Sequence, residues 1–552
     1  MAILDFIKGG DRRAFRWMLL CAVVAGLANA LLMVDVNLVA SLVAKGGRPT
    51  WGHAVAFVVV FAIFYQFDKL AVRRANIVVE RLLKGLRLGL VDKLRCSELQ
   101  VVEKLGRGNL YGAVAQGTNQ LSVTFPLLVE NFQQAVLLLI SLAYLAYLSL
   151  PALVVFLVAT LVGYATYRRL KQDFSATLQE IARQEAAMLD AIGDIIDGGK
   201  ELRLGSKRSE SVFRAYQELS RSTEALLSRS GEHSISMVLL GSFVVYSLLA
   251  VVAFLFPRYM NLQGTVVFQL IPTILFCMSP LVRILTYSPM FVQSEVGLNA
   301  ILRIEHELEA GGRVEPWQAH GMAIKHRDFQ RIGYSGLAFA YRDSKDEPIF
   351  TVGPVDLEIR RGETVFLVGG NGSGKSTIAR LVAGLLRANA GRIEIDGVAV
   401  EGREIAGLRE LFSAILGDFH LFDRLYGLEQ VDPAAVTRLI GEMGLSGKVA
   451  FEEGRFTDLR LSTGERKRLA LIAALLEDRP IYLFDEWSAE QDAHFREAFY
   501  ARVIPGLKAR GKTVIAVTHD DRFWHLADRV IKLDLGTVVW EHSGAELADG
   551  SA

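Results

Sequence analysis

The sequence predicts two fused parts of different fold class: an all-α part with six membrane-spanning helices, and an α/β part built around a phosphate-binding loop. Two observations carry this prediction. First, hydrophobic residues make up 51% of the 552 residues and the mean hydropathy is +0.30, which is high for a soluble protein. Second, after about residue 332 the long apolar stretches give way to short strands, glycine-rich turns and helices.

Six apolar stretches in the first part are long enough, or nearly so, to cross a bilayer, whose hydrocarbon core of about 30 Å takes around 20 helical residues. They lie at approximately 17–44, 51–67, 125–148, 150–167, 234–256 and 264–291. Lys8, Arg12, Arg13 and Arg16 precede the first stretch, and the long connections after the second and fourth are also rich in charge. This distribution predicts that the N-terminus, both connections and everything after about residue 292 lie in the cytoplasm.

The overall charge excludes one class of partner. Lys and Arg number 61 and Asp and Glu number 60, so the net charge of +1 provides no global field for attracting nucleic acid. The three cysteines, Cys21, Cys96 and Cys277, are scattered and have no spacing typical of a metal site or a disulfide framework.

The two long connections, 68–124 and 168–233, contain amphipathic stretches and are expected to continue the spans as helices into water. Breaks at 103–110 and 197–205 supply turns at the far ends of these helices. Such turns favour contact with another domain. The alternative is that both connections are only solvated linkers, as charged segments usually are.

The stretch GGNGSGKST provides the phosphate-binding loop. Its residues are Gly369, Gly370, Asn371, Gly372, Ser373, Gly374, Lys375, Ser376 and Thr377. A buried strand is expected before it at 364–368, and a helix is expected after it, ending near Leu386. In this context the backbone N–H groups of the loop and of the helix start point at the β- and γ-phosphates of a nucleotide. Lys375 adds a mobile cation, and Ser376 offers a hydroxyl to Mg²⁺.

Two further motifs supply groups for hydrolysis. The apolar strand that begins at Ile481 ends in Asp485, which is expected to hold Mg²⁺, and Glu486, which is expected to polarise the attacking water. The alternative is a strand that ends in solvated acids. His519 follows another strand, where its imidazole can reach a γ-phosphate, although an isolated histidine at such a place is more often structural.

A second helix start also has groups suited to phosphate. The segment LSTGE, which comprises Leu461, Ser462, Thr463, Gly464 and Glu465, opens the helix GERKRLALIAALL. The Ser462 hydroxyl and the Gly464 N–H lie at its N-terminus, where the helix dipole favours negative charge.

Taken together, these motifs resemble the Walker A, signature, Walker B and switch-histidine motifs of the nucleotide-binding domain of ABC transporters. The six spans with two long cytoplasmic connections resemble an exporter half. The resemblance implies a transmembrane domain of the type I exporter class (type IV ABC fold) at 1–310, a linker at 311–331 and an ABC nucleotide-binding domain at 332–552. It also implies ATP and Mg²⁺ as cofactors, with Lys375, Glu486 and His519 as the catalytic residues.

The same resemblance implies further residues and a partner. Tyr341 matches the aromatic residue that stacks on adenine, and Ser488, Ala489 and Asp492 lie in the segment that matches the D-loop. Tyr341 as a plain core aromatic is the alternative. In this family the signature of one subunit closes over the P-loop of the other, so the resemblance implies a homodimer with two identical ATP sites in the inner membrane.

The particular residues within the motifs indicate a narrower group of ABC transporters. The segments FSAILGDFHLFD, LSTGERKRLAL and FDEWSAEQD resemble exporters of cyclic peptides and of siderophore-type peptide precursors, including the pyoverdine and syringomycin exporters. This similarity implies a peptide-like small molecule as cargo, with ATP hydrolysis driving its export by alternating access.

Two positions depart from the usual family pattern. Most ABC domains carry a glutamine that contacts both the metal and the membrane domain, and here Gly417 occupies that position. Asp418 could replace the missing ligand directly or through a water, or the metal could lose that ligand. Glu465 stands where glutamine is more common in the signature, and its charge would repel a triphosphate. The catalytic set is intact, so hydrolysis is still expected.

Asp35 and Arg283 are ionisable residues placed well inside predicted spans. A charge at the centre of a helix in a bilayer costs about 2.5 to 3.5 kcal/mol on insertion scales, so such groups usually face a wet cavity or each other. We expect both to line the transport cavity. The alternative is that either lies near a membrane edge and extends its charged end towards water.

Three other functions compete with peptide export. A lipid flippase or a multidrug exporter would use the same ATPase with a different cavity. A soluble ABC-type ATPase acting on nucleic acid or ribosomes is disfavoured by the six spans. A gated channel that uses ATP without pumping is disfavoured by the intact Glu486.

Overall fold

The computed structural model describes residues 12–44, 46–251, 254, 264–310, 321, 325–342 and 347–548. Lys8, the end of the fifth predicted span and most of the predicted linker at 311–331 lie outside these residues. The chain divides into two compact units: Met1–Arg95 with Val101–Ala310, and Cys96–Gln100 with Gly311–Ala552.

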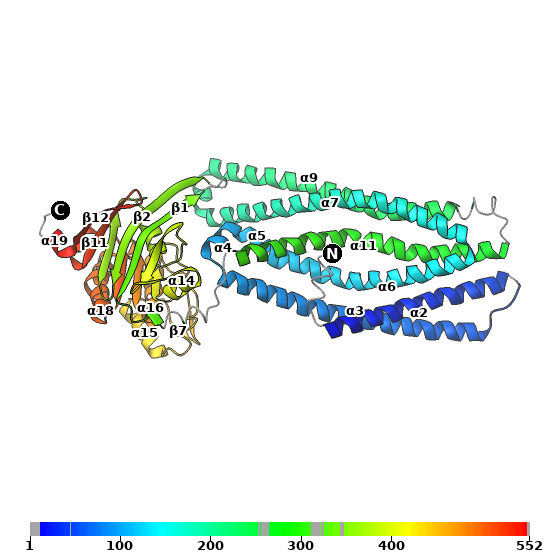
Figure 1. Cartoon of the computed structure of the whole chain (residues 1–552), viewed down its shortest axis with the longest axis horizontal. Coiled ribbons are helices and arrows are strands. Elements are labelled where there is room, and N and C mark those ends of the chain that lie inside the picture. Colours follow the sequence, from blue (N-terminus) through cyan, green and yellow to red (C-terminus); the bar gives the residue numbers. More distant parts are fainter. Residues whose placement is uncertain are drawn as a thin grey trace. The chain divides into compact units, whose positions relative to one another are not determined.

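The first unit is all-α. Within the described residues, six of its helices are long and apolar enough to cross a membrane, which confirms the predicted spans. They are α2 (Arg12–Ala44), α3 (Trp51–Cys96), α6 (Thr118–Leu148), α7 (Leu150–Asp197), α9 (Ser206–Ala250) and α11 (Gly264–Ala310) (Figure 1). Four of these helices have 45 or more residues, and at about 1.5 Å per residue each is roughly twice as long as the hydrocarbon core is thick. The expected helical continuation of the spans is therefore confirmed.

Short helices connect these long ones at the expected breaks. After α3 the chain forms α4 (Leu99–Leu105), α5 (Arg107–Tyr111) and the π-helical turn η1 (Gly112–Gly117). Gly106, between α4 and α5, has a φ of 74°, a conformation that glycine adopts without strain. Between α7 and α9 lies α8 (Gly199–Leu204), with Gly198 and Gly205 at its two ends.

Close packing holds the first unit together. α11 packs against α6, α2, α9 and α7, and α7 packs along α9 (Figure 1). Buried polar side chains also pair between helices: Asn37 donates to Thr273 at 3.0 Å, and Ser294 donates to Thr124 at 2.7 Å. Such pairs satisfy polar groups where lipid provides no hydrogen-bond partner.

The second unit is α/β. Among its described residues, one sheet has the strand order β12-β11-β3-β10-β9-β6, in which all neighbours are parallel except β11 and β12, and an antiparallel sheet has the order β2-β1-β4-β5. The strands of the first sheet are β3 (Thr364–Gly369), β6 (Phe412–Ile415), β9 (Ile481–Asp485), β10 (Thr513–Val517), β11 (Arg529–Asp534) and β12 (Thr537–Ser543). Those of the second are β1 (Arg331–Arg342), β2 (Pro348–Arg360), β4 (Ala390–Ile395) and β5 (Val398–Ala399); β7 (Phe451–Glu452) and β8 (Arg455–Phe456) form a separate small pair.

Helices of the second unit include α13 (Lys375–Val382), α14 (Ile405–Arg409), α15 (Pro433–Glu442), α16 (Thr463–Glu477), α17 (Ala493–Ala498), α18 (Ile504–Ala509) and α19 (Gly544–Ala548). The helix expected to end near Leu386 ends four residues earlier, because the chain turns at Gly384, whose φ is 69°. Glycine in this left-handed conformation commonly ends a helix.

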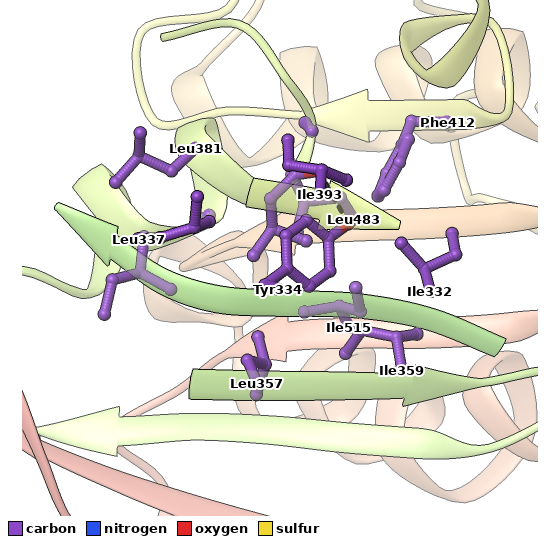
Figure 2. Packing of buried hydrophobic residues seen from close by; sticks show 14 of the residues in the cluster. Ile332, Tyr334, Leu337, Leu357, Ile359, Leu381, Ile393, Phe412, Leu483 and Ile515 are labelled. Atoms are coloured by element: carbon purple, nitrogen blue, oxygen red, sulfur yellow. Dashed lines mark hydrogen bonds between the residues drawn. The ribbon is translucent and has the colours of Figure 1, made fainter. Parts of the chain in front are cut away.

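Successive side chains of the central strands point to opposite faces of the sheet, so the second unit has two hydrophobic cores, one on each face. In β3, Val365 and Leu367 belong to one core, whereas Phe366 and Val368 belong to the other. This is the period of two expected for a strand buried on both faces. The first core fills the space between the two sheets and α13, and Figure 2 shows its side chains from β1, β2, β4, α13, β9 and β10. There the buried Tyr334 donates its hydroxyl to the carbonyl of Val382 at 2.9 Å, which anchors the end of α13.

Replacement of Gly26 tests the helix packing. A Cβ at this position would lie 2.9 Å from Val136 Cβ on α6 and 3.1 Å from the Gln133 carbonyl oxygen, so the two helices must separate. We expect Gly26→Ala to lower the free energy of unfolding by about 1–3 kcal/mol, as overpacking usually does. Thermal unfolding in detergent would measure this.

Gly85→Ala on α3 is the matched control, since no atom lies within 4 Å of its Cβ position. Equal melting temperatures for the two variants would contradict the packing assigned to Gly26.

Candidate nucleotide site

The phosphate-binding loop lies between β3 and α13, and its backbone requires glycine. Gly369 has a φ of 148°, and a Cβ there would lie 2.2 Å from the carbonyl oxygen of Leu533. Gly374, the residue before α13, has a φ of 95° and lies against Val352 and Gly536. These glycines let the chain turn sharply from the strand into the helix, so that the first N–H groups of α13 are directed to the loop.

Lys375 extends over this loop. Its Nζ donates to the carbonyl oxygens of Gly370 at 2.8 Å and Gly369 at 3.2 Å, and the residue is only 4% exposed. Burial lowers the pKa of Lys375, while the carboxylates of Glu486 and Asp485 oppose this effect. The ammonium is thus held within the loop by weak carbonyl partners, from which it can transfer to phosphate oxygens.

The residues expected to hold the metal are adjacent. Ser376, on α13, donates its hydroxyl to Asp485 Oδ1 at 3.0 Å, and Asp485 ends β9. Burial raises the pKa of Asp485, and the hydrogen bond from Ser376 partly offsets this. A buried carboxylate beside a hydroxyl, both with oxygen donors, fits a hard divalent ion such as Mg²⁺.

Gly417, at the position where most ABC domains have glutamine, and its neighbour Asp418 make different contacts. The backbone N–H of Gly417 bonds to Asp485, and a Cβ on Gly417 would lie 3.8 Å from Asp485 Oδ2. The Asp418 carboxylate instead pairs with the guanidinium of Arg380 on α13, at 2.9 Å. Asp418 therefore contacts α13, the helix that follows the phosphate loop. The contact with Asp485 is made by the backbone N–H of Gly417 and not by a side chain.

Glu486 and His519 meet directly. Glu486 Oε1 lies 3.1 Å from His519 Nε2, and both side chains remain partly exposed. The backbone of Glu486 is left-handed, with a φ of 52°, and its carbonyl accepts a 2.8 Å bond from Lys467 Nζ on α16. Lys467 is buried and also pairs with Glu490 at 3.3 Å. The role of Lys467 was not predicted from the sequence, because Lys467 lies in a run of charged residues, Glu465 to Arg468, that reads as a solvated helix face.

Tyr341 is near the phosphate loop. It pairs with Phe350 across β1 and β2, and the Phe350 ring lies 3.7 Å from the Cβ position of Gly374. The Phe339 ring packs edge-on against the Tyr341 ring, with 4.9 Å between centroids, and Tyr341 remains 36% exposed. This exposure leaves the aromatic side chain accessible for stacking, which does not suit a plain core residue.

The LSTGE segment forms a capped helix start. Ser462 is the N-cap of α16, and together with Glu465 it forms a capping box. Ser462 and Thr463 are exposed, whereas Leu461 packs against the second core. Gly464 allows a close approach, because a Cβ there would lie 2.6 Å from the carbonyl oxygen of Glu490.

The segment after Glu486 is held mainly by its own side chains. Ser488 hydrogen-bonds Tyr500 at 2.9 Å, and Asp492 caps α17 by accepting from the Phe495 N–H. Ala489 is bonded through its N–H to the Glu486 carbonyl at 3.3 Å. Gln491, which the sequence analysis did not single out, donates to the Gly464 carbonyl at 2.9 Å and so joins this segment to the LSTGE segment.

In the first unit, Asp35 and Arg283 have separate partners. Asp35 Oδ1 lies 3.1 Å from His53 Nδ1, beside a cavity of about 420 Å³ between α2 and α3 that is also lined by Trp51 and Phe57. Arg283 instead lies 3.9 Å from Glu130 and is half exposed. Each of these two residues is therefore paired with a residue of another helix.

Comparison with known proteins covers both units. A family model described as ABC transporter matches residues 352–489. The chain is 31% identical to the ATP-binding protein SyrD of Pseudomonas syringae pv. syringae, over 83% of this chain and 82% of that protein. It is 27% identical to an ATP-dependent lipid A-core flippase of Alkalilimnicola ehrlichii, over 86% and 81%. Its fold resembles a solved bacterial Atm1-family ABC exporter with ATP bound, with a TM-score of 0.77, 19% identity and coverage of 98% and 97%.

Substitution of Tyr341 tests its placement at the nucleotide. Stacking of an aromatic side chain on a base contributes about 1–3 kcal/mol, so Tyr341→Ala is expected to raise the Kd for ATP about tenfold. Tyr341→Phe keeps the ring and is expected to bind like the unmodified protein. Competition with a fluorescent ATP analogue measures both values, and an unchanged Kd for Tyr341→Ala would make Tyr341 a structural aromatic.

Proposed function

The chain belongs to the ABC transporter family, and on this premise we propose that it exports a cyclic peptide or a peptide siderophore precursor across the inner membrane. The family and the exporter fold establish an ABC exporter that binds ATP and couples its hydrolysis to transport. The similarity to SyrD supports the cargo class, because it extends over most of both chains and so includes the spans, where cargo is contacted.

The geometry of the nucleotide site supports hydrolysis by this chain's own residues. Backbone N–H groups of the loop and of α13 bind the phosphates, and Lys375 moves from the loop carbonyls to the phosphate oxygens. Glu486 orients the attacking water and accepts its proton, while His519, 3.1 Å from Glu486, contacts the γ-phosphate. Ser376 and Asp485 would hold Mg²⁺, which supplies positive charge to the phosphates.

We propose that two copies of the chain form the transporter. Ser462 and Thr463 lie exposed at the start of α16, where a second copy can present its ATP. Each copy would then bind ATP on its own phosphate loop and close its LSTGE segment over the ATP of the other. The distribution of Lys and Arg favours an arrangement with the N-terminus and the ATPase unit in the cytoplasm.

We further propose that Asp35 contributes to the cargo pathway. Asp35 and His53 form a polar pair between the apolar helices α2 and α3, beside a cavity lined in part by aromatic residues. A charge is retained inside a span at a cost, which favours a role in the pathway. Arg283, paired with Glu130 on α6, is the second candidate, and its exposure places it on an accessible face of α11.

A lipid flippase is the second candidate function. The similarity to the lipid A-core flippase of Alkalilimnicola ehrlichii has nearly the same coverage as that to SyrD, at lower identity. The two functions use the same ATPase and differ in the chemistry of the cargo.

The test of cargo is ATP hydrolysis by the purified protein in lipid nanodiscs, with Glu486→Gln as the blank. Cyclic peptides, peptide siderophores, lipids and cationic drugs are compared. We expect the cyclic or siderophore-type peptides alone to raise turnover. Stimulation by lipids instead would replace the peptide proposal with a flippase, and no turnover above the blank would contradict the assigned catalytic set.

Asp35→Asn tests the cargo pathway. Removing one charged hydrogen-bond partner typically costs about 1.5–3 kcal/mol, so the peptide concentration for half-maximal stimulation should rise about tenfold or more. Arg283→Gln tests the second candidate in the same way. Arg214→Gln, which removes an exposed charge paired with Glu210 on α9, is the matched control and should leave this concentration unchanged.

A half-maximal concentration for Asp35→Asn equal to that of the control would exclude Asp35 from the pathway.

A further inference from the structure

Glu465 is held by a lysine that no motif includes. Its Oε1 accepts from Lys448 Nζ, and its Oε2 accepts from the Ser462 backbone N–H at 2.9 Å and from the Ser462 hydroxyl at 2.8 Å. Lys448 lies in the turn after α15, and its side chain is 58% exposed, whereas the Glu465 side chain is 11% exposed. We propose that Lys448 is a positioning residue that makes the Ser462 hydroxyl and the Glu465 carboxylate compatible with ATP.

The Ser462 hydroxyl has a single proton to donate. This proton is donated to Glu465, and the Ser462 oxygen accepts from the Glu465 N–H at 3.4 Å. A phosphate oxygen is only an acceptor, so it needs that proton and gains nothing from the oxygen lone pairs. Ser462 must therefore turn its O–H away from Glu465 before it can bond a phosphate.

The charge of Glu465 also bears on ATP binding. Lys448, Ser462 N–H and Ser462 O–H together lower the pKa of Glu465 to about 2, with the bond from Lys448 as the largest cause. The carboxylate is therefore ionised at neutral pH and lies one turn from the residue that meets the triphosphate. The Lys448 ammonium neutralises it, which removes a like-charge repulsion and weakens the hold of the carboxylate on the serine proton.

Both effects act in the same direction. Without Lys448, the Glu465 carboxylate would keep the serine proton more tightly and would present an unbalanced negative charge towards the phosphates. This inference rests on the proposed closure of the LSTGE segment over the ATP of a second copy. It explains how a glutamate is tolerated at a position where the family usually has glutamine.

The test is a double-mutant cycle on the full chain in nanodiscs, in a Glu486→Gln background so that bound ATP is not consumed. The measured quantity is the Kd for MgATP. We expect Lys448→Met to raise it about fivefold at low ionic strength. Lys448→Arg should restore the starting value, because it keeps the charge. In a Glu465→Gln background, Lys448→Met should change the Kd by less than about twofold, because no carboxylate remains to be neutralised.

Salt supplies an independent readout. The effect of Lys448→Met should shrink as ionic strength rises from about 0.01 to 0.3 M, since an exposed charge is screened over that range. Lys508→Met is the matched control. Lys508 pairs with Asp528, and Asp528, like Glu465, also accepts a hydrogen bond from a backbone N–H. That N–H belongs to Thr364, which lies at the end of β3 farthest from the phosphate loop. Its Kd should match that of the unmodified background.

Three results would overturn the inference: an unchanged Kd in Lys448→Met, an equal effect of Lys448→Met with and without Glu465→Gln, or a loss of affinity that salt leaves unaltered. A thermal melt of each variant identifies a general loss of stability. Failure here leaves the exporter proposal intact, because cargo-stimulated turnover is measured separately on the protein with its native Glu486.

Discussion

The nucleotide site depends on the parallel pairing of β3, β10 and β9. Val517 of β10 lies opposite both Leu367 of β3 and Asp485 of β9, so the three strands end at one edge of the sheet. The phosphate loop follows the end of β3, Asp485 and Glu486 lie at the end of β9, and His519 follows the end of β10. Ser376 and Asp485, which are 109 residues apart along the chain, are thereby brought within hydrogen-bond distance of each other, and so are Glu486 and His519, which are 33 residues apart.

A second set of contacts ties α16 to that edge. The buried Lys467 donates to the Glu486 carbonyl, the Trp487 indole N–H donates to the Lys467 carbonyl at 2.9 Å, and Gln491 donates to the Gly464 carbonyl. The start of α16 and the backbone of Glu486 therefore form one connected piece. A displacement of the LSTGE segment on the proposed closure would be transmitted to Glu486 through these bonds.

The helical unit follows a different constraint, because lipid offers no hydrogen bonds to polar groups. Its spans are continuous helices, which satisfy their own backbone, and buried side chains such as Asn37 and Thr273 pair with each other between helices. Gly26 allows α2 and α6 to approach closely. The Asp35–His53 pair, by contrast, lies beside a cavity, and this is the basis for proposing that Asp35 contributes to the cargo pathway.

The sequence by itself determined the two fold classes, the six spans and the order of the nucleotide motifs, because hydrophobic periodicity and glycine-rich turns are local signals. Tertiary structure decided which side chains meet. Asp418 forms an ion pair with Arg380, and Lys467 donates a hydrogen bond to the Glu486 carbonyl. The Glu465 carboxylate accepts hydrogen bonds from Lys448 and Ser462. The helix α13 ends at Val382. These contacts join separate elements, and a hydrogen bond requires atoms about 3 Å apart, a precision that residue type and spacing cannot supply.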